Sequence, residues 1–277
     1  MRFSKTGNIT FCCDSSGDRR YIHRVAEVVC ARYDGSGLRW QLPDSEQMWK
    51  LSLGGRAGVL GVTLDGRTCC VKLFYDRRLR TRIRVWLGFA KGRRAYANGL
   101  RLERVGVSCP KMWGYAERRP VGPVILVTEL ATRGSRLDLW AAEHPPGREA
   151  ATALARFIRD MHDRGVFHID LSARNILICP AEDRFEFLLL DYEDARFVRR
   201  VGRRTRLKNL HHLHERMAAS IPLRTRLRFL RQYAGPDYRR YRDTLRRMLA
   251  RSKRYRRLQQ TLATKTDSVR SSSGQSL

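Results

Sequence analysis

The chain has 277 residues, 42% of them hydrophobic and 30% charged, which is typical of a globular protein long enough for two lobes. Its 56 Lys and Arg outnumber 27 Asp and Glu, and the net charge of +29 favours polyanionic partners: nucleic acid, anionic lipid or anionic glycans. Seven cysteines without C-x-x-C spacing disfavour a zinc site or disulfide framework, and we find no membrane span or signal peptide. We therefore expect a cytoplasmic protein whose membrane contact is at most peripheral.

The N-terminal third changes in pattern near Trp49. Residues 1–46 contain turn signals at D-S-S-G and D-G-S-G, and we expect an N-terminal extension of irregular structure. Residues 51–53, 59–64 and 69–74 then read as three strands, with a glycine-bearing first turn and Asp65-Gly66 as a hairpin turn. The sequence predicts an antiparallel sheet here.

Residues 77–105 have a helical period that Gly92 interrupts, and residues 124–130 read as a buried strand. The first helix has an apolar face and an arginine-rich face. Either the arginines are simply solvated, or they dock on anionic lipid, where each basic residue adds about 1 kcal/mol.

The remainder of the chain is predicted to be mainly helical. Apolar spacing from Leu154 to Met161 indicates a helix that ends just before Gly165. Two short strands follow at residues 176–178 and 185–190. Further helices are expected at residues 207–217, 226–233 and 238–262, and a disordered tail at residues 264–277.

The most specific motif is H-x-D-x-x-x-x-N at residues 168–175, followed by an apolar strand, which is typical of the catalytic loop of protein kinases. Phosphoryl transfer needs a carboxylate beside the attacking hydroxyl and oxygen ligands for a divalent metal. We predict Asp170 as the catalytic base and Asn175 as a metal ligand. Asp191 ends a buried strand and is the second predicted ligand of Mg²⁺ or Mn²⁺, in the place of the D-F-G aspartate.

Upstream residues are candidates for binding ATP. By the same resemblance to protein kinases, Lys72 in V-K-L-F would hold the α- and β-phosphates; an isolated lysine of this kind could also snorkel from a strand edge. Gly54, Gly55 and Gly58 would let the backbone approach phosphate closely, although G-G-R-A-G is not G-x-G-x-x-G and a plain hairpin turn is nearly as well supported. The resemblance also implies that Glu129 lies where the lobes would join and that its backbone would meet adenine.

From about residue 49 to 233, these motifs resemble the Kdo/WaaP lipopolysaccharide kinase family. The resemblance is carried by V-K-L-F at 71–74, G-V-S-C-P at 106–110, H-I-D-L-S-A-R-N-I-L at 168–177 and L-D-Y at 190–192, with R-L-K-N-L at 206–210 and R-F-L at 228–230. It implies an α+β, two-lobed protein-kinase-like fold, with an antiparallel β N-lobe over residues 47–130 and a mainly helical C-lobe over residues 131–263. It also implies transfer of the γ-phosphate of ATP to Kdo or heptose of the lipopolysaccharide inner core.

The sequence departs from the common kinase pattern on the helix after Lys72. Kinases pair the strand lysine with a glutamate on this helix. The expected position holds Ala95, and Glu103 comes a turn or two too late. Either another carboxylate orients Lys72, the helix register differs from the one expected, or the enzyme is weak. The departure favours a non-catalytic pseudokinase, whereas Lys72, Asp170, Asn175 and Asp191 together favour an enzyme.

The segment after Asp191 also differs. Ile169 replaces the arginine that pairs with an activation-loop phosphate in many protein kinases, and no A-P-E-like segment follows. The segment instead carries six arginines, at positions 196, 199, 200, 203, 204 and 206. We expect these to favour an anionic glycolipid acceptor over a peptide, although a protein or other small-molecule acceptor stays open. Nucleic-acid binding is not favoured, because aromatic residues are thinly interleaved with the arginines.

Overall fold

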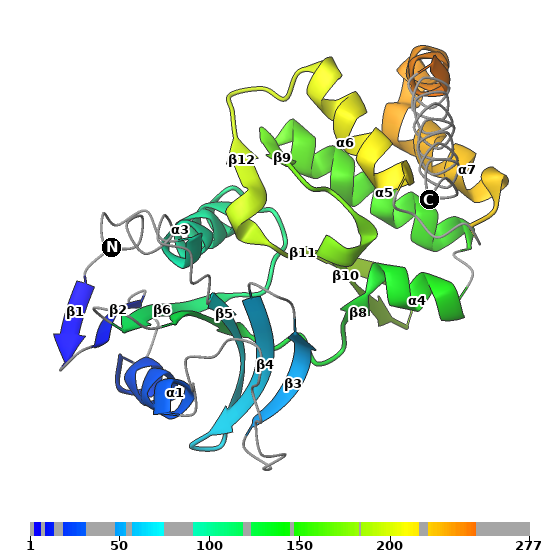
Figure 1. Cartoon of the computed structure of the whole chain (residues 1–277). Helices are drawn as coiled ribbons and strands as arrows, with labels where there is room; N and C mark the ends of the chain where they lie inside the picture. The colour runs from blue at the N-terminus through cyan, green and yellow to red at the C-terminus, as the bar shows by residue number, and fades with distance from the viewer. Residues whose placement is uncertain are drawn as a thin grey trace, which may run out of the picture.

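The computed structural model of the chain describes residues 3–6, 9–13, 19–31, 48–53, 57–74, 91–118, 123–144, 147–182, 184–215 and 221–247. An N-terminal lobe built on one large sheet lies beside a mainly helical C-terminal lobe (Figure 1). This arrangement confirms the predicted α+β, two-lobed fold. The predicted helix over residues 77–90, most of the glycine-bearing turn and the C-terminal tail lie outside the described residues.

Within the described residues, the N-terminal sheet has seven strands, all paired antiparallel, in the order β1-β2-β6-β7-β5-β4-β3. The strands are β1 (Phe3–Thr6), β2 (Ile9–Cys13), β3 (Met48–Leu53), β4 (Ala57–Leu64), β5 (Arg67–Phe74), β6 (Met112–Arg118) and β7 (Val124–Glu129). Asp65 and Gly66 both have positive φ in the β4–β5 turn, as a tight hairpin requires. The three strands and the hairpin turn predicted for residues 51–74 are confirmed, as is the strand over residues 124–130.

The segment before Trp49 differs from the irregular structure expected of it. Where the structure describes residues 1–46, they add β1 and β2 to the sheet and pack α1 (Arg19–Ala31) against it. The buried side of α1 includes Ile22, Val25, Ala26 and Val29, at helical spacing. Strands of four and five residues give little periodic signal, and the turn signals on either side of them obscured it.

Lys72 faces the C-terminal lobe because of strand alternation. Its neighbours Val71 and Leu73 belong to the core that α1 covers, so the Lys72 side chain points to the opposite face. This second face is covered by α3 (Lys91–Arg104), whose buried side consists of Gly92, Ala95, Tyr96, Gly99 and Leu102. The small residues on this side let the helix lie close to the sheet.

The C-terminal lobe contains α4 (Leu137–Glu143), α5 (Arg148–Asp163), α6 (Arg203–Glu215), α7 (Leu223–Ala234) and the short helix η3 (Gly235–Asp237). Helical backbone continues over residues 238–247. The four predicted helices are therefore confirmed where they are described. No described helix is long and apolar enough to cross a membrane.

Two small sheets hold the loops between these helices. One joins β8 (Ser135–Arg136), β10 (Ile176–Ala181) and β11 (Arg184–Leu189); the other joins β9 (Val166–His168) and β12 (Ala195–Phe197). The short helices η1 (Ala173–Asn175) and η2 (Tyr192–Asp194) adjoin them. The two predicted strands are thus present as β10 and β11, and they deliver the residues of the candidate site.

Gly165 is required where α5 turns into β9. Its φ is +76°, and a Cβ at this position would lie 2.1 Å from the backbone oxygen of Val198. A hydrogen bond from the Val198 N–H to the Gly165 carbonyl (2.9 Å) joins the same two residues, so their backbone segments cannot easily separate to make room for a Cβ.

We therefore expect Gly165→Ala to lower the free energy of unfolding by roughly 2–5 kcal/mol, from left-handed strain and the clash together. Urea unfolding followed by circular dichroism measures this. Gly202→Ala is the control, since an added Cβ there meets nothing within 4 Å. A change of less than about 1 kcal/mol is expected at this exposed position, and an equal effect of both substitutions would contradict the argument.

Candidate active site

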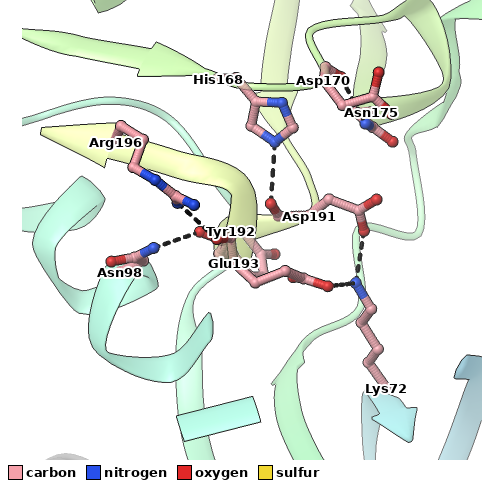
Figure 2. A network of polar contacts seen from close by, with 9 residues as sticks. All are labelled: Lys72, Asn98, His168, Asp170, Asn175, Asp191, Tyr192, Glu193 and Arg196. Atoms are coloured by element: carbon pink, nitrogen blue, oxygen red, sulfur yellow. Dashed lines mark hydrogen bonds and ion pairs between the residues drawn. The ribbon is translucent and has the colours of Figure 1, made fainter. Parts of the chain in front are cut away.

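The structure brings together the three residues predicted at the catalytic centre (Figure 2). The amide nitrogen of Asn175 donates to the backbone oxygen of Asp170 (2.9 Å), which closes the loop between them. The Leu190 N–H donates to the backbone oxygen of Asn175 (2.9 Å), which places Asp191 directly beside this loop. Fully buried His168 holds the other side, with Nε2 3.0 Å from the Asp191 carbonyl oxygen.

Asp191 follows the end of β11 and precedes η2, in a left-handed backbone conformation with φ of 54°. Asp and Asn adopt this conformation more readily than most residues. The Asp194 N–H donates to the Asp191 carbonyl (2.9 Å) and closes η2. The side chain of Asp191 is 41% exposed, so its carboxylate stays accessible to a ligand.

Lys72 makes two ion pairs across the lobes. Its Nζ donates to Asp191 Oδ1 (2.6 Å) and to Glu193 Oε1 (2.9 Å). Burial lowers the pKa of Lys72, but the two carboxylates outweigh it, and the net shift is upward. Lys72 is therefore a fixed, charged side chain on the interior face of the sheet, which does not fit the alternative of a lysine snorkelling to solvent.

Two contacts at this site were not anticipated from the sequence: Glu193 on Lys72, and Asn98 of α3 on η2. Asn98 Nδ2 donates to the backbone oxygens of Tyr192 (2.7 Å) and Ala195 (3.2 Å). The acidic residue two positions after Asp191 was the available signal for Glu193. Nothing in the local pattern marks Asn98.

Packing explains why the helix position expected to hold a glutamate holds Ala95. Ala95 is fully buried on the sheet-facing side of α3. Glu103 lies at the far end of α3 and accepts a hydrogen bond from the Met112 N–H (2.6 Å). The sequence-based view that Glu103 is too late to serve Lys72 agrees with this contact.

The other predicted nucleotide-binding residues remain predictions. Gly58 lies within β4, paired with Leu53 and Leu73, while Gly54 and Gly55 are outside the described residues. Glu129 ends β7, and its N–H already donates to the Lys111 carbonyl (2.9 Å). A contact of Glu129 with adenine would therefore have to use its carbonyl oxygen.

The donor set suits a divalent cation that is shared with phosphates. The described part of the chain has no cluster of three or more His, Cys, Asp or Glu side chains suited to a metal. Mg²⁺ in phosphoryl-transfer sites is typically held by one or two protein oxygens, with phosphates and water completing its shell. Asp191 offers a carboxylate, and Asn175 offers its amide oxygen because its nitrogen is occupied by Asp170. These two residues fit the predicted role.

A buried polar frame supports the predicted catalytic loop on the side of α6. Asn209 of α6 binds the backbone of His168 on both sides, as Oδ1 accepts from its N–H (3.3 Å) and Nδ2 donates to its carbonyl (2.9 Å). The same Oδ1 lies 3.1 Å from Nε2 of His162, whose Nδ1 lies 2.7 Å from the Tyr233 hydroxyl. A neutral His162 with its proton on Nε2 satisfies all of these contacts.

Acid is expected to weaken this frame. Burial lowers the pKa of His162 to about 4 against 6.5 in the unfolded chain; Arg206 acts in the same direction, while Asn209 and Asp163 oppose it. Between pH 6.5 and 4 the unfolded chain binds a proton that the native state does not, so His162 should reduce the free energy of unfolding by about 3 kcal/mol over this window. Urea titrations from pH 7 to 4 should show this loss in the wild type and a shallower one in His162→Gln. Parallel curves would contradict it.

The six arginines after Asp191 differ in what their side chains contact. Arg196 donates to the backbone oxygens of Glu193 (2.9 Å) and Ala195 (2.8 Å). Arg206 donates to the Val201 carbonyl and pairs with Asp163 (2.7 Å). These two support the backbone, whereas four remain exposed: Arg199, Arg200, Arg203 and Arg204.

Comparison with known proteins agrees with this geometry. Residues 53–233, well over half of the chain, match the model of the lipopolysaccharide kinase (Kdo/WaaP) family. The protein belongs to this family. Membership of a kinase family implies a phosphotransferase that uses ATP.

A solved structure of WaaP in complex with acyl carrier protein is also similar to this member of the family. The match covers 88% of this chain and 97% of that one, with a TM-score of 0.60 and 24% sequence identity. At this identity the likeness supports the fold alone. A search of curated proteins gives no match.

Proposed function

We propose that this protein transfers the γ-phosphate of ATP to a sugar hydroxyl, of Kdo or heptose, in the lipopolysaccharide inner core. The observation that carries the proposal is the joining of Asp170, Asn175 and Asp191 on two adjacent loops, with Lys72 bound across from the N-terminal lobe. This arrangement supports a working kinase over a non-catalytic pseudokinase.

Each residue has a distinct part in the proposed reaction. Asp170 orients the acceptor hydroxyl and takes its proton as the phosphorus–oxygen bond forms. Lys72 holds the α- and β-phosphates as a point charge. Asn175 and Asp191 would bind the divalent cation, which when bound neutralises charge on the phosphates. The resulting products are ADP and the phosphorylated sugar.

The surroundings of Asp191 support a glycan acceptor over a peptide. β12 follows η2 immediately and pairs with β9, and α6 begins at Arg203. The chain therefore has little length here for the extended segment on which protein kinases dock peptides. The four exposed arginines lie on this stretch and suit a phosphorylated or carboxylated sugar.

Phosphate transfer to purified acceptors tests the proposal. Wild-type protein with labelled ATP and Mg²⁺ should phosphorylate lipopolysaccharide that contains Kdo and heptose, and mass spectrometry of the core should locate the new phosphate. Arg199→Ala combined with Arg200→Ala should raise KM for the glycan while leaving KM for ATP unchanged. Transfer to protein substrates only would reject the glycan acceptor.

We also propose that this protein binds an acyl carrier protein, as WaaP does in the solved complex. An apolar cavity of about 310 Å³ supports this; among the described residues, α4, α5, α6 and α7 enclose it. Its lining includes Trp140, Leu154, Leu213, Phe229, Leu230 and Tyr238, with Arg226, Arg242 and Arg246 beside them. An acyl chain would suit the apolar walls. Gel filtration should show a complex with acylated carrier protein and weaker binding of the unacylated form; equal or absent binding would reject the proposal.

A further inference from the structure

Two carboxylates pair with Lys72, and both lie after the end of β11: Glu193 is in η2, and Asp191 directly precedes η2. Glu193 lies 2.9 Å from Nζ and Asp191 lies 2.6 Å from it (Figure 2). In the common kinase arrangement one partner comes from the helix after the lysine strand. Glu103 is the only acidic residue of α3, and it is bound to the Met112 backbone at the far end of the helix.

We propose that Glu193 is the positioning residue for Lys72, in place of the missing helix glutamate, and that Asn98 supplies the contribution of α3 by fixing the turn that carries Glu193. The inference deepens the proposed function and rests on it, because Lys72 is positioned for the phosphates of ATP.

Burial distinguishes the two carboxylates. The Glu193 side chain is 13% exposed and that of Asp191 is 41% exposed. Asp191 is the predicted metal ligand, so its oxygens face the cation and phosphates when these bind. Glu193 lies deeper and remains with Lys72. The lysine thus has one partner reserved for its orientation.

The second carboxylate oxygen of Glu193 supports this assignment. Glu193 Oε2 is buried and has no hydrogen-bond partner within the described part of the chain. A buried carboxylate is costly unless it is paired. The ion pair with Lys72 offsets this cost. Such a buried pair would be unusual for a glutamate whose role is only to stabilise its own turn.

The packing of α3 explains why the carboxylate is on the turn. This helix lies so close to the sheet that a Cβ at Gly99 would come 2.3 Å from the sulfur of Met112. A glutamate at Ala95, on the same buried side, would have to displace the core. Asn98 instead donates to the carbonyls of Tyr192 and Ala195, on both sides of Glu193.

The fixed turn couples Lys72 to the catalytic loop. Arg196 donates to the carbonyl of Glu193 itself (2.9 Å), and the Ile169 N–H donates to the Asp194 carbonyl (3.0 Å). Glu193 therefore holds the N-terminal lobe to the catalytic loop through Lys72.

Glu193→Gln tests the assignment, since it keeps the shape and removes the charge. We expect kcat/KM for ATP to fall roughly 10- to 100-fold, because a phosphate-binding group that is displaced by about 1 Å costs rates of this order. The affinity for Mg²⁺ with a non-hydrolysable ATP analogue, measured by calorimetry, should fall several-fold. Loss of a nearby negative charge would by Coulomb's law tighten binding of a polyphosphate, so weaker binding indicates lost positioning.

The matched control is Glu186→Gln, at an exposed glutamate of β11 that pairs with Arg184; its binding and kcat/KM should equal those of the wild type. A coupling experiment adds Glu193→Gln to Lys72→Met. If Glu193 acts through Lys72, the second change should cause no further loss of nucleotide affinity, whereas additive losses would overturn the proposal.

Asn98→Ala provides an independent test in which every charge is kept. Like Glu193→Gln, it should lower kcat/KM for ATP. If thermal unfolding shows that Glu193→Gln does not fold, Asn98→Ala replaces it as the test variant. If the wild type binds the nucleotide and folded Glu193→Gln binds it with the same affinity, the positioning role is overturned and the proposed kinase function is left intact. Failure of the wild type to bind Mg²⁺ and the ATP analogue would overturn both.

Discussion

Asp170→Asn is expected to lower phosphate transfer to the glycan roughly 10²- to 10⁴-fold, the range that a positioned general base contributes. The change removes the group that orients the acceptor hydroxyl and takes its proton, and it leaves the backbone carbonyl that holds Asn175. KM for ATP should therefore change little, since the nucleotide contacts proposed for Lys72 and Asp191 remain.

The measurement is steady-state transfer of labelled phosphate at saturating ATP, with nucleotide affinity measured separately. Asp160→Asn, at an exposed aspartate of α5, is the matched control and should have wild-type activity. Retention of more than about a tenth of the wild-type rate in Asp170→Asn would remove Asp170 from the role of base.

Asp191→Asn is expected to reduce activity by a similar factor, but for a different reason. It removes a charged ligand from the predicted cation site and one of the two ion pairs of Lys72. The backbone should tolerate the change, because Asn also adopts the left-handed conformation found here. Binding of Mg²⁺ with nucleotide should weaken together with catalysis.

Thermal unfolding distinguishes this loss from misfolding. Millimolar ATP with Mg²⁺ should raise the midpoint of the wild type, because a ligand that binds only the native state stabilises it. The midpoint of Asp191→Asn should be close to that of the wild type without nucleotide and should rise little with it. Asp194→Asn removes a carboxylate from the same turn and should keep the full shift. An unchanged nucleotide shift in Asp191→Asn would argue against a metal ligand at this position.

The strongest sequence signals were those confined to one short segment. The spacing from His168 to Asn175, and an apolar strand that ends in Asp191, are local patterns, so residues 168–175 could be predicted to form a catalytic loop before the fold was known. The hairpin at Asp65 and Gly66 was predictable for the same reason. Its two φ values are positive, and few residues accept that conformation.

The arginines after Asp191 show what composition leaves open. Their number suggested an anionic glycolipid acceptor, but charge alone does not say which way a side chain points. The fold assigns Arg196 and Arg206 to backbone carbonyls and leaves the other four exposed. Likewise β1 and β2 were missed because short strands are stabilised by their partners in the sheet more than by their own sequence.

The partner of Lys72 was decided by tertiary structure alone. The sequence established that the usual helix position holds Ala95, and it correctly discounted Glu103. It could not identify Glu193, which is 121 residues from Lys72, or Asn98, which is 94 residues from Tyr192. Contacts over such separations depend on how closely α3 packs on the sheet and where β11 ends. The sequence thus determined which chemical groups this kinase carries, while the packing of the two lobes decided which of them meet.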